Sequence, residues 1–270
     1  MPPSGLAILM GAGPTTASGI ARILAHPSHG NLAVALLSRS ADAGLAERLS
    51  RESQGGTLRA FKTDTTESSL TSVFEEIKSW AKSQSVGIKL AIWNIKHSHK
   101  VPFEDESPTK FGDSLQTYVT GAMIFSQLSL KWMLAQYPED TTTDSSGGGS
   151  GEFMVKKGTI VFTGTLGALR TNAGYAAYGA GRSGVRMLAQ SLAREYSAKG
   201  VHVVHAIANG GIVDVDTTAE DADVKDKLAK VNLGEKMRAE SVGKLYLQCM
   251  NQSCDLWIHE LDMRPAREKF

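Results

Sequence analysis

Residues 159–165 read TIVFTGT, and residues 175–182 read YAAYGAGR. The first segment is an apolar run that ends in small residues, which is typical of a buried strand. Residues 175–198 are rich in Ala, Leu, Met and Arg, so they predict a helix, which Gly200 ends. The apolar run 201–208 then predicts another strand. A strand, a helix and a strand in this order form a right-handed crossover in a parallel sheet.

The predicted helix carries Tyr178 and Arg182 four positions apart, so their side chains share one face. A phenol held beside a fixed cation can donate a proton to a substrate. Taken alone, a tyrosine in a helix is more often a packing residue with its hydroxyl at the surface. The strands on either side favour the catalytic interpretation.

A second strand, turn and helix begin the chain. Residues 6–10 are apolar, residues 11–19 are a turn of small residues, and residues 20–24 have a helical composition. This arrangement places the pyrophosphate of a dinucleotide on backbone amides at a helix N-terminus. The first turn is therefore a predicted phosphate site, although glycine-rich turns are also common as plain connections.

Strands and helices continue to alternate along the chain. Further strands are expected at 31–37, 58–61, 88–96 and 256–261, and helices at 41–53, 67–83, 111–137 and 241–250. The pattern predicts one α/β domain over residues 1–270, Rossmann-like, with a doubly wound parallel sheet of about seven strands and helices on both faces. The low-complexity stretch at about 138–151 is expected to be a flexible insertion rather than a domain boundary.

Composition limits the class of partner. Hydrophobic residues make up 41% of the chain, charged residues 21%, and the net charge is +1. This balance offers no field for nucleic acid or an anionic membrane, so we expect a small-molecule substrate. No segment reaches membrane-spanning length and the first residues do not form a secretion signal, so we expect a cytoplasmic protein. Cys249 and Cys254 are expected to be free thiols.

A possible metal motif lies after the fourth strand, where residues 97–99 read His-Ser-His. Two histidines at this spacing can bind a metal ion. No carboxylate or cysteine cluster completes the set nearby in the sequence. Loop histidines are therefore the preferred interpretation, and no metal is expected.

The segment 158–214 resembles the catalytic half of the short-chain dehydrogenase/reductase family. That family carries Tyr-x-x-x-Lys on this helix, a serine at the end of the preceding strand and an asparagine on the helix before that. Tyr178 matches the tyrosine, Arg182 stands at the lysine, Thr165 at the serine, and Tyr118, less securely, at the asparagine. The resemblance implies that Tyr178, Arg182 and Thr165 are the catalytic residues, and that Tyr178 and Arg182 also bind the cofactor, with Arg182 holding its ribose.

The same resemblance implies a nicotinamide cofactor at the first turn. The family motif TGxxxGxG is matched at Gly11, whereas Thr15 and Ala17 stand where its later glycines belong. Gly13 lies in the same turn. Alanine is nearly as small as glycine, while Thr15 adds a hydroxyl at the cost of crowding the turn.

The second strand ends at Ser38 and Arg39 without a carboxylate. A carboxylate at this position would hold the ribose hydroxyls of NAD, whereas a guanidinium suits the ribose phosphate of NADP. Arg39 therefore favours NADP(H) over NAD(H). A solvated surface arginine is the alternative.

Four further residues are assigned to cofactor binding by the resemblance. Asp64 and Thr65 end the third strand, where the family contacts adenine, and Asp64 can equally cap the following helix. Asn94 keeps an amide where the family has Asn-Asn-Ala-Gly. Ile212 stands where a backbone amide holds the nicotinamide carboxamide. The charged stretch 214–230 resembles a substrate lid, with a solvated helix as the default.

The end of the chain reads WIHELDMRP at residues 257–265, which is similar to a largely fungal and bacterial subgroup of the family. The resemblance thus covers nearly the whole chain, and it implies a homodimer or homotetramer through the helices at about 111–137 and 174–199.

Two hypotheses for function follow. The first is an NADP(H)-dependent oxidoreductase that reduces a carbonyl, or oxidises an alcohol, on a small organic molecule, with secondary metabolism as the setting. The second is a divergent family member that acts on an imine, steers a cyclisation, or serves as an inactive ligand-binding or partner subunit. The substitutions at Tyr118, Thr165 and Arg182 fit the second, because arginine cannot give up its proton as lysine can.

Overall fold

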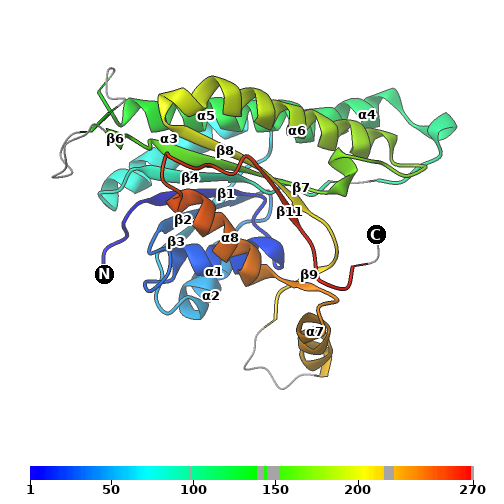
Figure 1. The fold of residues 1–270 in the computed structure, drawn as a ribbon, viewed down its shortest axis with the longest axis horizontal. Coiled ribbons are helices and arrows are strands. Elements are labelled where there is room, and N and C mark those ends of the chain that lie inside the picture. The colour runs from blue at the N-terminus through cyan, green and yellow to red at the C-terminus, as the bar shows by residue number, and fades with distance from the viewer. Residues whose placement is uncertain (98, 139–142, 145–152, 216–221, 269–270) are drawn as a thin grey trace.

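The computed structural model describes residues 1–97, 99–138, 143–144, 153–215 and 222–268. Its centre is a parallel sheet of seven strands with helices on both faces (Figure 1). This confirms the fold class predicted from the alternating pattern. In spatial order the strands are β11 (Glu260–Met263), β8 (Val201–Ala208), β7 (Gly158–Gly164), β4 (Ile88–Trp93), β1 (Leu6–Met10), β2 (Ala33–Ser38) and β3 (Leu58–Lys62).

Strand β1 is apolar and buried along its whole length, as expected of a parallel strand that is covered on both faces. In β1, Leu6, Ile8 and Met10 enter the core on one face, whereas Ala7 and Leu9 enter the core on the other. Side chains alternate between the faces of a strand, so one apolar run supplies two hydrophobic cores.

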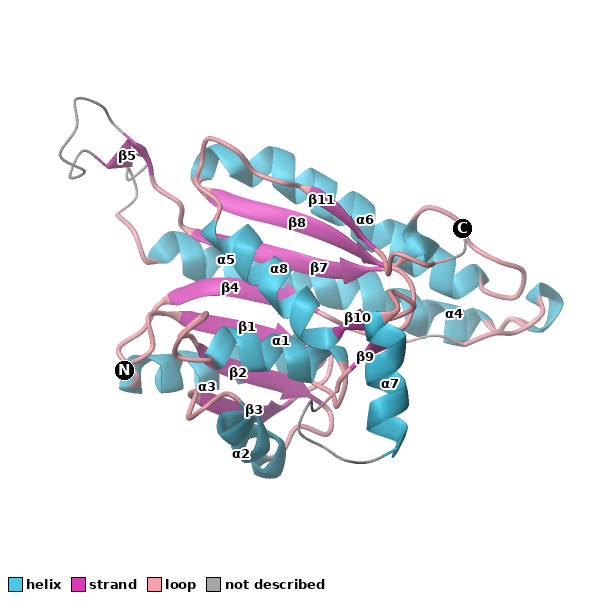
Figure 2. Ribbon diagram, turned by 60° about the horizontal axis from the view of Figure 1, so that its bottom comes forward, coloured by secondary structure: helices cyan, strands magenta, loops and turns pink. Residues whose placement is uncertain are grey.

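The helices divide between the two faces, as Figure 1 shows. One face carries α1 (Thr16–Ala25), α2 (Ala43–Glu52) and α8 (Ala239–Asn251), and the other carries α3 (Glu67–Ser83), α4 (Pro108–Leu115), α5 (Gly121–Ala135) and α6 (Ala176–Tyr196). Helix α7 (Ala222–Asn232) lies beside the carboxyl ends of the strands (Figure 2). Among the described residues, no helix is both long and apolar enough to cross a membrane.

The single helix expected over 111–137 is wrong in detail. The structure has α4, then a π-helical turn at Gln116–Thr120, then α5. A π-helical turn adds a residue to the helical repeat and so re-aims the side chains within it. Here it contains Tyr118, which is fully buried.

The last strand also differs from the expected range 256–261. It is β11, which begins at Glu260 and pairs with β8 from His205 onward. Trp257 instead stacks on His202 with ring centroids 5.0 Å apart, and Ile258 donates its N–H to the side chain of Gln252. These contacts hold the residues before Glu260 against the end of α8 and outside the ladder.

Two short strand pairs were not expected from the sequence. Thr143–Asp144 (β5) pairs antiparallel with Phe153–Met154 (β6), and Ile212–Val213 (β9) pairs parallel with Met237–Arg238 (β10). The pair β9–β10 lies at the carboxyl edge of the sheet (Figure 2). Most of the insertion expected at 138–151 lies outside the described residues.

Candidate active site

A cavity of about 900 Å³ opens where the parallel strands end. It is lined by residues that follow β1, β2, β3, β4, β7 and β8, together with residues of α6. All the residues assigned from the sequence line it: Gly11, Gly13, Thr15, Ala17, Ser38, Arg39, Asp64, Thr65, Asn94, Thr165, Tyr178, Arg182 and Ile212. The carboxyl ends of parallel strands meet at one edge, which is why residues so far apart in sequence gather here.

The first turn is shaped by two glycines. Gly11 has φ +91°, and a Cβ there would lie 2.2 Å from the carbonyl oxygen of Asn94. The side-chain amide of Asn94 in turn donates to the carbonyl of Gly11 at 3.4 Å. A Cβ at Gly13 would meet nothing within 4 Å, so the backbone there faces open space in the cavity. A ligand can therefore approach the main chain at Gly13.

The start of α1 adds an anion-binding feature. Thr15 occupies the cap position without a side-chain hydrogen bond to the helix, and the first turn of α1 contains no acidic residue. Amide groups at a helix N-terminus that lack such a cap favour a negatively charged ligand. Thr15, Thr16 and Ala17 all line the cavity.

The ends of β2 and β3 place a cation near a carboxylate. Arg39 is exposed and lines the cavity next to Ser38. Hydrogen bonds from the hydroxyl and N–H of Thr66 hold the pKa of Asp64 below its usual range, with smaller contributions that include the charge of Arg39. Asp64 Oδ1 accepts both Thr66 bonds, at 2.6 and 2.8 Å, so it organises the turn before α3.

The hydroxyls of Tyr178 and Thr165 lie 2.7 Å apart at the other end of the cavity. Thr165 also accepts the N–H of Gly167 at 3.2 Å, which orients its hydroxyl. A Cβ at Gly167 would lie 2.5 Å from Cε1 of Tyr178, so the phenol packs directly on this turn. Strand β7 positions the threonine and α6 positions the tyrosine.

Arg182 lies beneath this pair and is 4% exposed. Its Nη1 donates to the carbonyl of Thr163 at 2.9 Å and its Nη2 to the carbonyl of Ile95 at 3.0 Å. Its Cζ lies 4.5 Å from the ring centroid of Tyr118 and 5.3 Å from that of Tyr178. The guanidinium thus joins the ends of β4 and β7 to the two aromatic rings.

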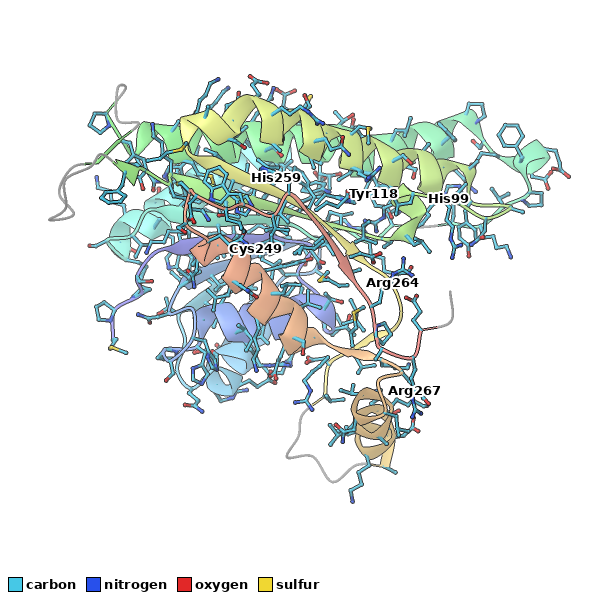
Figure 3. All side chains as sticks on the ribbon, viewed as in Figure 1. His99, Tyr118, Cys249, His259, Arg264 and Arg267 are labelled. Atoms are coloured by element: carbon cyan, nitrogen blue, oxygen red, sulfur yellow. The ribbon has the colours of Figure 1, made fainter. Side chains whose placement is uncertain are left out.

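The sequence did not predict the contacts that Tyr118 makes in the site. Its hydroxyl accepts the backbone N–H of His97 at 2.8 Å, and burial raises its pKa. Figure 3 shows it within the layer of helices that covers the sheet. A buried aromatic in a helix has no distinctive signal. The small residue Gly181 was a hint, since a Cβ there would lie 2.7 Å from Cδ2 of Tyr118.

Two other sequence features have separate outcomes. His99 pairs with Glu106, with Nε2 2.8 Å from Oε2. Among the described residues there is no group of three or more His, Cys, Asp or Glu side chains that could hold a metal ion. In the stretch 214–230, Asp214 accepts from Arg22 Nη1 at 3.1 Å, residues 216–221 lie outside the described residues, and α7 follows.

Comparison with known proteins identifies the family. The family model described as short chain dehydrogenase matches residues 6–226. The chain therefore belongs to the short-chain dehydrogenase/reductase family, which confirms the resemblance seen in the sequence, and it is an oxidoreductase of the NAD(P)-dependent class. A search of curated protein sequences finds no significant match.

Several solved structures share the fold. A short-chain dehydrogenase from Rhodopseudomonas palustris is 22% identical, with a TM-score of 0.70 over 97% of this chain and 98% of that chain. A 3-oxoacyl-[acyl-carrier protein] reductase from Brucella melitensis in complex with NAD is 19% identical, with a TM-score of 0.72 over 96% and 95%. An alcohol dehydrogenase from Thermococcus sibiricus complexed with 5-hydroxy-NADP is 15% identical, with a TM-score of 0.72 over 98% of each chain.

Proposed function

We propose that this chain is an NADP(H)-dependent reductase of a carbonyl group on a small organic molecule, with Tyr178 as the proton donor. The observation that carries the proposal is the 2.7 Å contact between the hydroxyls of Tyr178 and Thr165 in the same cavity as the first turn. A hydroxyl pair at this distance can bind one substrate oxygen from two sides.

The cavity has features that suit a dinucleotide. The open backbone at Gly13 and the start of α1 offer amide groups to a pyrophosphate. Arg39 stands where a ribose phosphate would be held, and Ser38 introduces no repelling carboxylate. The preference for NADP(H) over NAD(H) rests on these two residues. The remainder of the cofactor would lie against Asp64, Thr65, Asn94 and Ile212.

A bound nicotinamide would supply the hydride. Tyr178 would give its proton to the substrate oxygen, and Thr165 would donate a second hydrogen bond to that oxygen. Arg182 places a fixed positive charge 5.3 Å from the centroid of the Tyr178 ring, beside the group that would transfer the proton. The next proton must come from the cavity, since arginine does not release its own.

The arginine contacts also support a second candidate. Both Nη atoms of Arg182 donate to backbone carbonyls, so the cation has a structural role in the site. A site in which the arginine does not resupply a proton suits a substrate that brings its own proton, such as a protonated imine. Imine reduction is therefore the second candidate, and a ligand-binding role is what remains if no turnover is found.

We also propose that the chain forms a homodimer or homotetramer through α5 and α6. Met123 on α5 is 39% exposed and Met187 on α6 is 50% exposed, so each helix presents an apolar side chain to solvent. Light scattering on the parent and on Met187→Lys would test this. A monomeric parent contradicts it.

Deuterium transfer tests the proposed function. The enzyme would be incubated with NADPH deuterated at the transferable position and with a panel of ketones, aldehydes and cyclic imines. Deuterium at the former carbonyl carbon supports carbonyl reduction, and deuterium only at the imine carbon supports the second candidate. Absence of label in every product contradicts both.

A further inference from the structure

The guanidinium of Arg182 packs on the rings of two tyrosines that stand at 81° to one another, 6.1 Å apart. It is nearer to Tyr118, at 4.5 Å, than to Tyr178, at 5.3 Å. Contact between a cation and an aromatic face is stronger when both groups are removed from water. Tyr118 is 0% exposed and Arg182 4% exposed, so this contact is almost dry.

Three features of the chain hold the Tyr118 ring in place. The π-helical turn Gln116–Thr120 directs it inward, and the N–H of His97 fixes its hydroxyl. Gly181 gives the ring room on α6, one residue before Arg182. The ring is therefore built into the site from three separate segments.

We propose that Tyr118 is a positioning residue for Arg182: its ring supports the guanidinium so that both Nη atoms reach the carbonyls of Thr163 and Ile95. This rests on the proposed function, in that Arg182 serves a cavity that holds a nicotinamide cofactor. Tyr118 acts through Arg182 and does not itself touch substrate. The two residues form one unit whose contributions are not independent.

The consequence for lysine runs against the family resemblance. The resemblance alone predicts that Arg182→Lys keeps or raises activity, because lysine is the family residue. The guanidinium is a planar fork that donates to two carbonyls and lies over the Tyr118 ring, whereas an ammonium is a compact point charge. Lysine at 182 would lose either one of the two carbonyl hydrogen bonds or the contact with the Tyr118 ring. The contacts therefore predict that Arg182→Lys lowers activity.

The first test needs no cofactor. Arg182 Nε is buried, so its N–H is shielded from exchange with water and should give a distinct side-chain signal in a ¹⁵N–¹H spectrum. Because Nε has no hydrogen-bond partner among the described residues, the position of this signal should depend mainly on the neighbouring rings. Its loss in Arg182→Lys assigns the signal. Tyr118→Asn should move or broaden it, because the ring current and the support are removed. Tyr118→Phe, which keeps the ring, should leave it sharp and close to its original position.

A control variant and a second variant that moves the Tyr118 ring complete this test. Tyr137→Asn removes another tyrosine whose ring lies near a cation, Lys157 at 5.8 Å, outside the cavity, and should leave the signal unchanged. Gly181→Ala should displace the Tyr118 ring without removing it and so shift the signal, which keeps the test valid if Tyr118→Asn does not fold. An unmoved signal in a folded Tyr118→Asn or Gly181→Ala overturns the proposal, as does Tyr118→Phe behaving like Tyr118→Asn.

The second test is a double-mutant cycle on NADPH affinity. Tyr118→Asn and Arg182→Lys should each weaken binding about 2-fold to 30-fold, the range of a cation–aromatic contact. The double variant should bind NADPH little more weakly than the weaker-binding single variant, since both changes break the same contact. If the two fold-losses in affinity instead multiply in the double variant, the proposed coupling between Tyr118 and Arg182 is wrong. A parent that binds no NADPH contradicts the proposed function, while the spectrum still decides the role of Tyr118.

Discussion

The hydroxyl of Tyr178, from α6, lies 2.7 Å from the hydroxyl of Thr165, at the end of β7. A helix and a strand thus bring two proton-bearing oxygens to one point of the cavity. Because Thr165 is also held by the N–H of Gly167, its free hydrogen-bonding capacity is directed at the tyrosine and at whatever oxygen lies beside it.

Replacing Tyr178 with Phe should lower turnover by roughly 10²–10⁴-fold while NADPH affinity stays nearly the same, because the ring is kept and only the acid is removed. Steady-state kinetics with the substrate found by deuterium transfer, together with calorimetry, measures both quantities. Tyr196→Phe, at the far end of α6, is the matched control and should behave like the parent. Parent-like turnover of the Tyr178 variant would make the tyrosine a packing residue.

Arg39→Asp should weaken NADPH binding by about 1–3 kcal/mol, the range of a charge-assisted hydrogen bond, and should leave NADH affinity equal or better. The reason is that the guanidinium would pair with the ribose phosphate, which NADH lacks. Arg51→Asp changes the same charge outside the cavity and serves as the control. Unchanged NADPH affinity would show that Arg39 is only a surface residue.

Gly13→Ala should reduce cofactor affinity without reducing stability. A Cβ at Gly13 meets no protein atom within 4 Å, yet it would project where a ligand approaches the backbone. Gly112→Ala, also free of contacts and located inside α4, should leave affinity unchanged and raise stability by about 0.5–1 kcal/mol. Thermal unfolding and calorimetry on both variants check this. If the Gly13 variant binds NADPH like the parent, the first turn is a plain connection.

His202 gives the protein a pH-dependent loss of stability. Burial lowers its pKa to about 4, although the carbonyl of Ile258 opposes this shift. As the pH falls from about 6.5 to about 4, the unfolded chain takes up a proton that the folded chain does not, so the free energy of unfolding decreases. The decrease is about 3 kcal/mol at most.

Urea unfolding of the parent and of His202→Gln across this pH range measures the effect. The variant has no titrating group at this position, so the difference between the two proteins should change with pH in this window only. Parallel curves would mean that the folded and unfolded states of His202 titrate alike.

Much of the fold could be predicted because apolar periodicity reports directly on it. The helix expected at 67–83 and the strand expected at 201–208 have those bounds in the structure. The buried residues of the helix recur at helical spacing, and the strand is buried at every position. The π-helical turn that interrupts 111–137 leaves no such trace. Its hydrogen bonds span five residues instead of four, which changes the spacing of side chains only slightly, and the neighbouring α5 is apolar on most sides.

The site was predictable in its location and much less in its contacts. Parallel topology brings the strand ends together, so Gly11, Arg39 and Thr165 had to share one edge. The partners of Arg182 are backbone carbonyls of Thr163 and Ile95, and any residue type offers a carbonyl. No sequence pattern distinguishes those two, and the role of Tyr118 follows only once they are known.

Calorimetric titration of the parent protein with NADPH and, separately, with NADH tests the central claim most directly, because every step assigned to Tyr178, Thr165 and Arg182 requires a nicotinamide cofactor in the cavity. The account predicts saturable binding of both cofactors at one site per chain, with NADPH the tighter of the two. Absence of detectable binding by either cofactor would contradict it.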